Sequence, residues 1–244
     1  MEWDLYLFLK CAGIAVLVFA GGYSISRAFN ISRSKAYLIN SAAVFAAFAG
    51  SRAWYIVQHY YGSEPYVFTS LRDAWDNSGS VLYGWVIGGT LMLVFLTRRL
   101  KLDTIKYLDI VLPWLLVAQS LNRLGCFDAG CCYGAATTLP FPFSVQGDIA
   151  GGRVHPVQLY EAVFDLLFFW FIRTRPKKRG LPTFLYFVGY PTARFFFEFL
   201  RGDNQPAALG LTVPQIASVV LVTFALIKLR PPVIVTTPPK TRKK

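Results

Sequence analysis

The chain has 244 residues, of which 55% are hydrophobic and 16% are charged, and its mean hydropathy is +0.43. This composition is too apolar for an ordinary soluble domain and is typical of an integral membrane protein. The net charge of +12 would suit a nucleic-acid-binding protein, but the distribution of the basic residues argues against that class. The N-terminal sequence MEWDLYLF is acidic and lacks a basic n-region, so we do not expect a cleavable signal peptide.

Seven apolar stretches are each roughly long enough to cross a bilayer as a helix. In chain order they are Leu5–Tyr23, Ala36–Tyr60, Val81–Thr97, Tyr107–Leu121, Val157–Ile172, Leu181–Leu200 and Leu209–Leu229. The fourth is the least regular, because Asp109 and Pro113 interrupt it and because it is short. A β-barrel would show alternating apolar and polar residues rather than continuous apolar runs. We therefore predict an all-α integral membrane protein with seven transmembrane helices.

The basic residues gather in alternate loops. The loops after the first, third and fifth stretches, together with the C-terminal tail, hold 18 of the 25 Lys and Arg residues. These are Arg27, Arg33, Lys35, Arg98, Arg99, Lys101, Lys106, Arg173, Arg175, Lys177, Lys178, Arg179, Lys228, Arg230, Lys240, Arg242, Lys243 and Lys244. The intervening loops hold only Arg72, Arg123, Arg153 and Arg201. This positive-inside pattern predicts an N-terminus outside and a C-terminus in the cytoplasm. The basic residues then mark topology and contact anionic lipids, and no nucleic-acid partner is expected.

The chain is predicted to form one membrane domain, residues 1–230, followed by a basic, Pro-rich tail, residues 231–244. We interpret the tail as a disordered cytoplasmic end. The outer loops are longer than the basic ones: Pro65–Ser80 reads as an interfacial loop, and Arg123–Pro156 is the longest. Loops of that length inside a compact domain are usually functional. The outer side is therefore where we look for chemistry.

Five separate segments place polar residues at a similar depth near this outer side. They are Arg52, Tyr83, Arg123, the run from His155 to Glu161, and Arg194 with Glu198. Polar residues placed at random in the apolar stretches would not all lie at the same depth in the membrane. Their coincidence predicts a cavity that is open to the outer leaflet.

The segment GYPTARFFFEFLRGD, Gly189–Asp203, carries the most informative charges. Arg194 and Glu198 are four residues apart, which places them on one face of a helix, with Arg201 nearby. Charges at membrane depth are costly and usually face a protein interior or a polar cavity, so they indicate function. The alternative is a structural ion pair that fixes helix packing.

Arginine is the residue type that suits a lipid phosphate. Its planar fork grips phosphate oxygens at two points, and in a membrane the abundant phosphate is the lipid headgroup. Arg123 and Arg194 are the stronger candidates. For Arg52, snorkelling to the membrane interface is an equal alternative.

Three of the four cysteines, Cys126, Cys131 and Cys132, cluster in the sequence at the outer side, whereas Cys11 lies in the first stretch and is expected to pack there. The spacing C-x4-C-C matches no common zinc pattern, so we expect no metal. A disulfide from Cys126 to Cys131 or Cys132 is an alternative on an oxidising face. Packing of small side chains in a tight Gly-rich turn is the simplest interpretation.

Four motifs follow one another between about Gly50 and Gln215. They read Gly50-Ser-Arg52-Ala-Trp-Tyr55, Arg123-Leu-Gly125 continuing through Gly130 to Gly134, His155-Pro-Val-Gln158-Leu-Tyr160-Glu161, and Tyr190-x-x-x-Arg194-x-x-x-Glu198-Phe-x-Arg201. Leu209-Gly210 and Gln215 come after the fourth. In this order they resemble the signatures of the bacterial prolipoprotein diacylglyceryl transferase family.

The resemblance implies a multi-pass enzyme of the bacterial plasma membrane with an active site that faces the outer leaflet. Enzymes of that family move a diacylglyceryl group from phosphatidylglycerol to the thiol of the lipobox cysteine in a secreted lipoprotein precursor. The product is a thioether, and glycerol phosphate leaves. The implied partners are phosphatidylglycerol, the prolipoprotein signal peptide and membrane lipids, and no cofactor is implied.

The resemblance also implies the site residues. Arg123 and Arg194 would hold the phosphate, where they stabilise the charge of the leaving group, and Glu198 and Tyr190 would orient Arg194. The residues expected to act in catalysis are Arg123, Arg194, Glu198, Tyr83 and His155. The residues expected to bind substrate are Arg52, Arg123, Gly134, Gln158, Tyr160, Glu161, Tyr190, Arg194 and Arg201.

The chain departs from the family pattern at several positions. Where the central signature usually has Asn, Asn and Glu, this chain has Cys126, Ala129 and Cys131, and where the third segment usually has His-Gly-Gly it has Tyr83-Gly84-Trp85. The nucleophile is a thiolate, so a proton must be removed, and a tyrosine with a pKa of about 10 is a poor base. The alternative role for Tyr83 is a hydrogen bond to the headgroup alone. His155 is the other candidate base, although its motif could equally cap a helix.

Three other functions remain open from the sequence. The first is an enzyme of the same fold that uses another acceptor or another phospholipid. The second is a non-catalytic phospholipid-binding membrane protein. The third is a thiol redox protein that uses the three clustered cysteines. A transporter is disfavoured, because the chain shows no repeat-related broken helices.

Overall fold

The computed structural model describes residues 5–61, 82–140, 145–146, 152–202 and 210–229. The predicted outer loop Pro65–Ser80 and the tail 231–244 lie outside the described residues. Within them the chain is all-helical apart from two short strands. The helices are α1 (Leu5–Ala15), α2 (Gly22–Phe29), α3 (Arg33–Tyr61), α5 (Leu82–Arg99), α6 (Thr104–Asp128), α7 (Val157–Thr174), α8 (Leu181–Phe197) and α9 (Val213–Lys228). A π-helical turn, Val16–Gly21, joins α1 to α2, and a 3-10 turn, Glu198–Leu200, extends α8.

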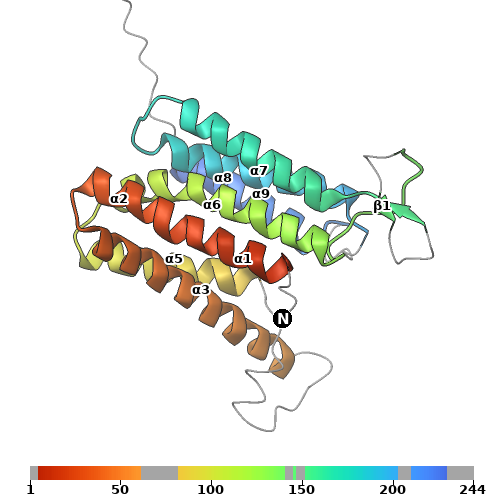
Figure 1. Cartoon of the computed structure of the whole chain (residues 1–244), viewed down its shortest axis with the longest axis horizontal. Helices are drawn as coiled ribbons and strands as arrows, with labels where there is room; N and C mark the ends of the chain where they lie inside the picture. The colour runs from red at the N-terminus through yellow and green to blue at the C-terminus, as the bar shows by residue number, and fades with distance from the viewer. Residues whose placement is uncertain (1–4, 62–81, 141–144, 147–151, 203–209, 230–244) are drawn as a thin grey trace, which may run out of the picture.

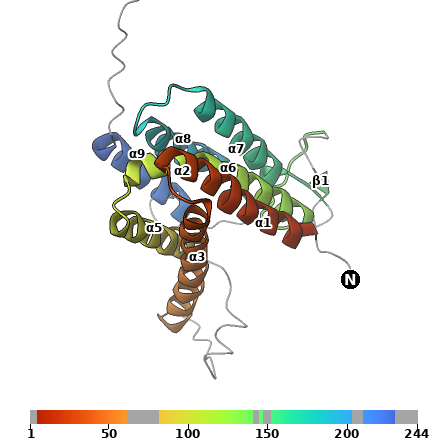
Figure 2. The ribbon, with the colours of Figure 1, turned by 60° about the vertical axis from the view of Figure 1, so that its left-hand side comes forward.

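The helices form a bundle in which α6 lies between α1 and α7 (Figure 1 and Figure 2). On one side of this group α3 and α5 pack against each other, and α8 pairs with α9. The buried apolar core is centred on α6 and draws on α2, α3, α7 and α8. Its members include Ile25, Ile39, Tyr107, Leu116, Ile172 and Tyr186.

Within the described residues each predicted apolar stretch is helical, the fourth over a longer range than predicted. Helix α6 begins at Thr104 rather than Tyr107 because Asp103 caps it, accepting bonds from the N–H groups of Ile105 (3.1 Å) and Lys106 (3.2 Å). Pro113 lies inside this helix. The interruption at Asp109 also has a physical reason, which lies in helix α8.

The Asp109 carboxylate serves the start of α8. It accepts bonds from the N–H groups of Gly180 (2.6 Å) and Thr183 (3.0 Å) and from the Thr183 hydroxyl (2.6 Å). The first N–H groups of a helix have no partner within the helix and favour a negative charge. The Asp109 carboxylate, which interrupts the apolar sequence of α6, therefore holds the start of α8 against α6.

Two helices of the described chain are long and apolar enough to cross a membrane, Leu5–Phe29 and Thr104–Asp128, and Val213–Lys228 is a shorter apolar helix. Many large apolar side chains also point away from the bundle. Among them are Leu38, Phe45, Leu91, Phe95, Leu167, Trp170 and Phe224. Such a surface is unusual for a soluble monomer and suits contact with lipid.

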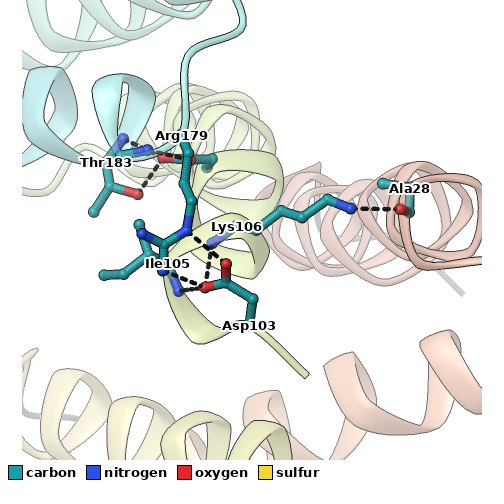
Figure 3. A network of polar contacts seen from close by, with 8 residues as sticks. Ala28, Asp103, Ile105, Lys106, Arg179 and Thr183 are labelled. Atoms are coloured by element: carbon teal, nitrogen blue, oxygen red, sulfur yellow. Dashed lines mark hydrogen bonds and ion pairs between the residues drawn. The ribbon is translucent and has the colours of Figure 1, made fainter. Parts of the chain in front are cut away.

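The basic loops meet at one end of the bundle (Figure 3). The Lys106 ammonium donates to the carbonyl of Ala28 at the end of α2 (2.8 Å). Arg179, in the loop after α7, donates through Nε (2.6 Å) and Nη2 (3.0 Å) to the Asp103 carboxylate. The hydrogen bonds from Arg179 are the main cause that holds the pKa of Asp103 below its usual range. The loops after the first, third and fifth predicted segments thus share one end, as the alternation of basic residues predicts.

Two of the loops predicted to face outward, those after α6 and after α8, meet at the other end of α6. Strand β1 (Val145–Gln146) pairs antiparallel with β2 (Arg153–Val154), with Val145 opposite Val154. Isolated bridges join Gly134 to Arg201 and Ala136 to Val154. These bridges connect the loop after α6 with the start of α7 and the end of α8.

Helices α3 and α5 cross at glycines. A Cβ atom added to Gly84 would lie 2.3 Å from the carbonyl oxygen of Gly50, and one added to Gly88 would lie 2.3 Å from that of Ala46. Both obstacles are backbone atoms that cannot rotate away. Small residues let helix backbones approach in this way in membrane proteins. Gly84 directly follows Tyr83, so this crossing helps to fix where Tyr83 lies.

Candidate functional site

Two partly buried arginines from different helices meet on one carboxylate. Glu161, in the first turns of α7, lies 2.6 Å through Oε2 from Nε of Arg123 on α6. Its Oε1 lies 3.1 Å from Nη1 of Arg194 on α8. The exposed fractions of the side chains are only 6% for Glu161, 17% for Arg123 and 13% for Arg194. One glutamate therefore sets the distance between the two cations.

A second carboxylate fixes Arg194 from its own helix. Nη2 of Arg194 lies 2.7 Å from Oε2 of Glu198, the i,i+4 pair that the sequence predicts. The Glu198 side chain is fully buried, and its Oε1 accepts a bond from the hydroxyl of Thr212 (2.9 Å). Arg194 thus spans two carboxylates with its two terminal nitrogens, which holds the guanidinium plane in one orientation.

These charges border a small cavity. It is lined by Arg123, Glu161, Phe164, Asp165, Tyr190, Ala193, Arg194 and Phe197, and its volume is about 10 Å³. That is room for about one water molecule, so a lipid phosphate enters only if the side chains around the cavity move. Arg123, Arg194, Glu161 and Tyr190, all expected in the site, are brought together here.

The remaining expected residues lie at varying distances from the cavity. Tyr83, near the start of α5, is within electrostatic range of Glu198 and Arg194, so it belongs to the same neighbourhood. Arg52, on α3, places its guanidinium 5.3 Å from the centre of the Phe48 ring, a cation–π contact. Neither Tyr83 nor Arg52 is among the residues that line the cavity.

His155 lies in the outer loop just before α7 rather than in the cavity. Its Nδ1 is 3.5 Å from the hydroxyl of Tyr160. The residue that precedes the first turn of α7 is Pro156, and it makes no side-chain cap bond. The His155 motif does stand at the start of α7, where the carbonyl of His155 accepts a bond from the N–H of Val157 (2.9 Å), while the imidazole lies beside Tyr160.

Gly134 and Gln158 hold the outer loop together. A Cβ atom on Gly134 would lie 2.5 Å from the carbonyl oxygen of Leu200 and 2.7 Å from Cβ of His155, so only glycine fits between these two segments of the chain. The buried amide of Gln158 donates through Nε2 to the carbonyl of Cys131 (2.6 Å). Arg201 donates its backbone N–H to the carbonyl of Glu198 (3.2 Å).

The three clustered cysteines also converge in space. All four cysteines of the chain are free thiols, and the sulfurs of Cys126, Cys131 and Cys132 lie within 4.8 Å of one another. Hydrogen bonding with Cys126, and then the charges of Arg201 and Arg123, lower the pKa of the Cys132 thiol to about 5. Burial raises the pKa of the Cys131 thiol. A negative charge in this cluster is therefore most stable on Cys132.

Two residues of the site were missed by the sequence reasoning. Asp165 lies one turn after Glu161 on α7, lines the cavity and is only 2% exposed. Its signal was present, because it is an acidic residue inside a run of apolar ones. Thr212, which donates to Glu198, carried no such signal, because a threonine before an apolar helix reads as an ordinary cap.

Comparisons with known proteins all point to one protein family. A sequence model of the family described as prolipoprotein diacylglyceryl transferase matches residues 1–230. A protein of Clostridium tetani named phosphatidylglycerol–prolipoprotein diacylglyceryl transferase is 33% identical over 68% of this chain and 72% of its own length. A Clostridium perfringens protein of that name, numbered 2, is 34% identical over 58% of each chain. A Clostridium novyi protein of that name is 28% identical over 93% of this chain and 90% of its own.

Proposed function

The chain belongs to the prolipoprotein diacylglyceryl transferase family, and from this premise we propose that it moves a diacylglyceryl group from phosphatidylglycerol to the lipobox cysteine of secreted lipoprotein precursors. The observation that carries the proposal is the pair of partly buried arginines, Arg123 and Arg194, held at one cavity by Glu161. A structural ion pair can lie anywhere in the bundle, whereas these two cations converge beside a cavity near the outer loops. Such an arrangement also suits an anionic ligand.

The reaction places its charge where these arginines lie. A thiolate forms a bond to the terminal glycerol carbon of the diacylglyceryl group, and the bond from that carbon to the phosphate oxygen breaks. The electron pair leaves with the phosphate as glycerol phosphate. Preorganised cations in a water-poor site stabilise such developing charge strongly. Arg123 pairs with Glu161 through Nε, so its terminal nitrogens are the groups that a phosphate would meet.

The charges around the cavity also limit how a phosphate binds. Arg123 and Arg194 carry two positive charges, and Glu161 and Glu198 balance them. A phospholipid phosphate therefore competes with Glu161 for the same guanidinium groups. We infer that the lipid binds as Glu161 yields one of its two arginines, while Glu198 keeps Arg194 in orientation. Tyr190 shares the cavity and is assigned to the same orienting role.

The other expected residues take supporting roles in this proposal. Tyr83 donates a hydrogen bond to the headgroup, and His155 lies on the side from which the acceptor peptide approaches. The residues assigned to substrate contacts around these are Arg52, Gly134, Gln158, Tyr160 and Arg201. The close packing of Gly134 and the bond from Gln158 to Cys131 support a role in shaping the loop that the substrates meet.

We also propose that the protein spans the bacterial plasma membrane seven times, with its N-terminus outside and the cavity toward the outer leaflet. The basic loops at one end and the loops with Gly134 and Arg201 at the other support this orientation. It places the reaction on the side where secreted precursors present their cysteine.

The test is an assay with purified protein, phosphatidylglycerol and a lipobox peptide that bears a free cysteine. Peptide mass and glycerol phosphate release are both measured, and Arg194→Ala runs beside the wild type. We expect a diacylglyceryl mass increase that Arg194→Ala abolishes. Saturable phosphatidylglycerol binding without product would instead favour a lipid-binding protein, and glycerol phosphate release without peptide modification would favour another acceptor.

A further inference from the structure

The turn after α6 brings three thiols to one point. Cys126 comes from the last turns of α6, and Cys131 and Cys132 follow the helix end. Their sulfurs lie within 4.8 Å of one another. The chain reverses here through two residues with positive φ, Gly130 (64°) and Cys132 (62°). Residues with a Cβ rarely adopt this conformation. The backbone thus accepts an uncommon geometry at a residue whose side chain joins the cluster.

Neighbouring elements hold this turn in place. The N–H of Cys131 donates to the carbonyl of Cys126 (3.0 Å). Gln158, 2% exposed at the start of α7, donates to the carbonyl of Cys131 (2.6 Å). Bonds to the backbone from two helices therefore fix the cysteines before any ligand arrives, a feature that packing of small side chains would not require.

The chemistry of three thiolates selects a soft or borderline metal ion, of which zinc is the common one in proteins. Zinc–sulfur bonds of about 2.3 Å place two thiolates of a tetrahedral site about 3.8 Å apart. The observed separations need only small rotamer changes to reach this. The negative charge of such a site is offset by Arg123, one turn before Cys126, and by Arg201, which hydrogen-bonds to Cys132.

Three protein ligands leave a four-coordinate zinc one ligand short, which is the pattern of catalytic rather than structural zinc. The proposed function supplies a fourth ligand, because its acceptor is itself a thiol. The same function also needs that thiol to lose its proton, and Tyr83 occupies the position where the family usually has a histidine. A thiol that coordinates zinc is deprotonated outright.

We propose that Cys126, Cys131 and Cys132 bind one Zn²⁺ ion, which takes the acceptor cysteine of the lipoprotein precursor as its fourth ligand; this inference rests on the proposed function. The acceptor S–H proton passes to water as its sulfur binds zinc. The sulfur then forms the bond to the glycerol carbon, and the carbon–oxygen bond to phosphate breaks with its electron pair on the phosphate. Nothing is oxidised or reduced. The resulting thioether is a weaker ligand and leaves.

Binding of the metal is tested first, without reference to activity. The full chain is purified in detergent under a reducing agent, and its zinc content is measured by mass spectrometry. We expect about one zinc per chain in the wild type and in the control Cys11→Ser, and background in Cys126→Ser, Cys131→Ser and Cys132→Ser. Cobalt substitution should give the absorption of tetrahedral thiolate coordination, and addition of a lipobox peptide should shift it. A wild-type zinc content equal to that of the Cys132→Ser variant would overturn the proposal.

The catalytic part is tested by the pH dependence of transfer. A free thiol with a pKa of about 8.5 is only about 3% thiolate at pH 7, so loss of ionisation on removal of zinc should slow transfer by up to about 30-fold there. We expect the zinc-loaded enzyme to be nearly independent of pH between about 6 and 8.5. Added zinc should restore the chelated enzyme.

The two proposals fail in distinguishable ways. Transfer at full rate after zinc removal would refute the metal while the transferase stands. Zinc bound by the three cysteines, with no transfer to any lipobox peptide, would refute the transferase and the assigned fourth ligand together. A disulfide between two of the three cysteines in protein taken directly from membranes would also overturn the metal site; it would be shown by thiols that react with an alkylating agent after reduction but not after addition of a chelator.

Discussion

Replacement of Arg194 by Lys is the most direct test of how the site holds its charge. The substitution keeps one positive charge but removes the planar fork. Arg194 uses Nη1 for Glu161 (3.1 Å) and Nη2 for Glu198 (2.7 Å), and a single lysine ammonium on a flexible stem cannot keep both contacts in the same plane. One charged hydrogen bond is therefore lost, and the orientation toward the phosphate is lost with it.

The loss can be estimated from these contacts. A hydrogen bond to a charged group contributes about 1.5–3 kcal/mol. If that interaction is felt fully in the transition state, kcat/KM falls by about 10- to 150-fold, since about 1.4 kcal/mol corresponds to a factor of ten. The assay is transfer to a lipobox peptide at varied phosphatidylglycerol concentration. Arg153→Lys, on the exposed residue of strand β2, is the matched control and should behave as the wild type.

An Arg194→Lys enzyme within about threefold of the wild type, equal to less than about 0.7 kcal/mol, would refute the reasoning. The fold must be intact for the comparison, so thermal unfolding in detergent accompanies the kinetics. A correctly folded, fully active variant would mean that Arg194 supplies only a general positive charge, and Arg123 would then have to grip the phosphate alone.

Three further predictions concern stability. Glu161→Gln leaves two partly buried arginines short of a shared anion. Removal of one partner of a fully buried ion pair costs about 3–5 kcal/mol, so we expect a clear fall in melting temperature up to that cost. An unchanged melting temperature would show that the pairing of Glu161 with Arg123 and Arg194 is not strong. Gly84→Ala forces a Cβ against the backbone of α3 and should lower the free energy of unfolding by about 1–3 kcal/mol. Val86→Leu, on the exposed face of α5, is the control and should leave it unchanged. Equal melting temperatures of the two variants would contradict the close crossing of α3 and α5. Asp103 has a pKa below its usual range because of Arg179, so its stabilising effect is present above the unfolded pKa of about 3.9 and is lost as the pH falls through the lower folded pKa. Asp103→Asn, which keeps a capping residue, should therefore be less stable than the wild type by under about 1 kcal/mol at pH 7, with the difference vanishing in acid; a difference that grows in acid would reverse the assignment.

The sequence alone determined the helices and the motifs that carry the charges, because both are local. Apolar run length fixes where a helix forms, the four-residue spacing fixes that Arg194 and Glu198 share a face, and the alternation of basic loops assigns those loops to one end. The residues at which helices begin and end were harder to predict from the sequence, and α6 is an example. Its start depends on Asp103 as a cap, and its acidic interruption at Asp109 is explained only by contacts with α8.

Only the tertiary structure decided which charges meet. Glu161 was one polar residue among several in its motif, and nothing within α7 indicates that it bridges Arg123 on α6 and Arg194 on α8. The cysteines show the same limit. Their spacing matches no common metal pattern, but the positive φ of Gly130 and Cys132 folds the turn back so that three sulfurs converge. Spacing along a chain reports on contacts within one helix or strand, whereas a site built from several elements depends on how their ends pack together.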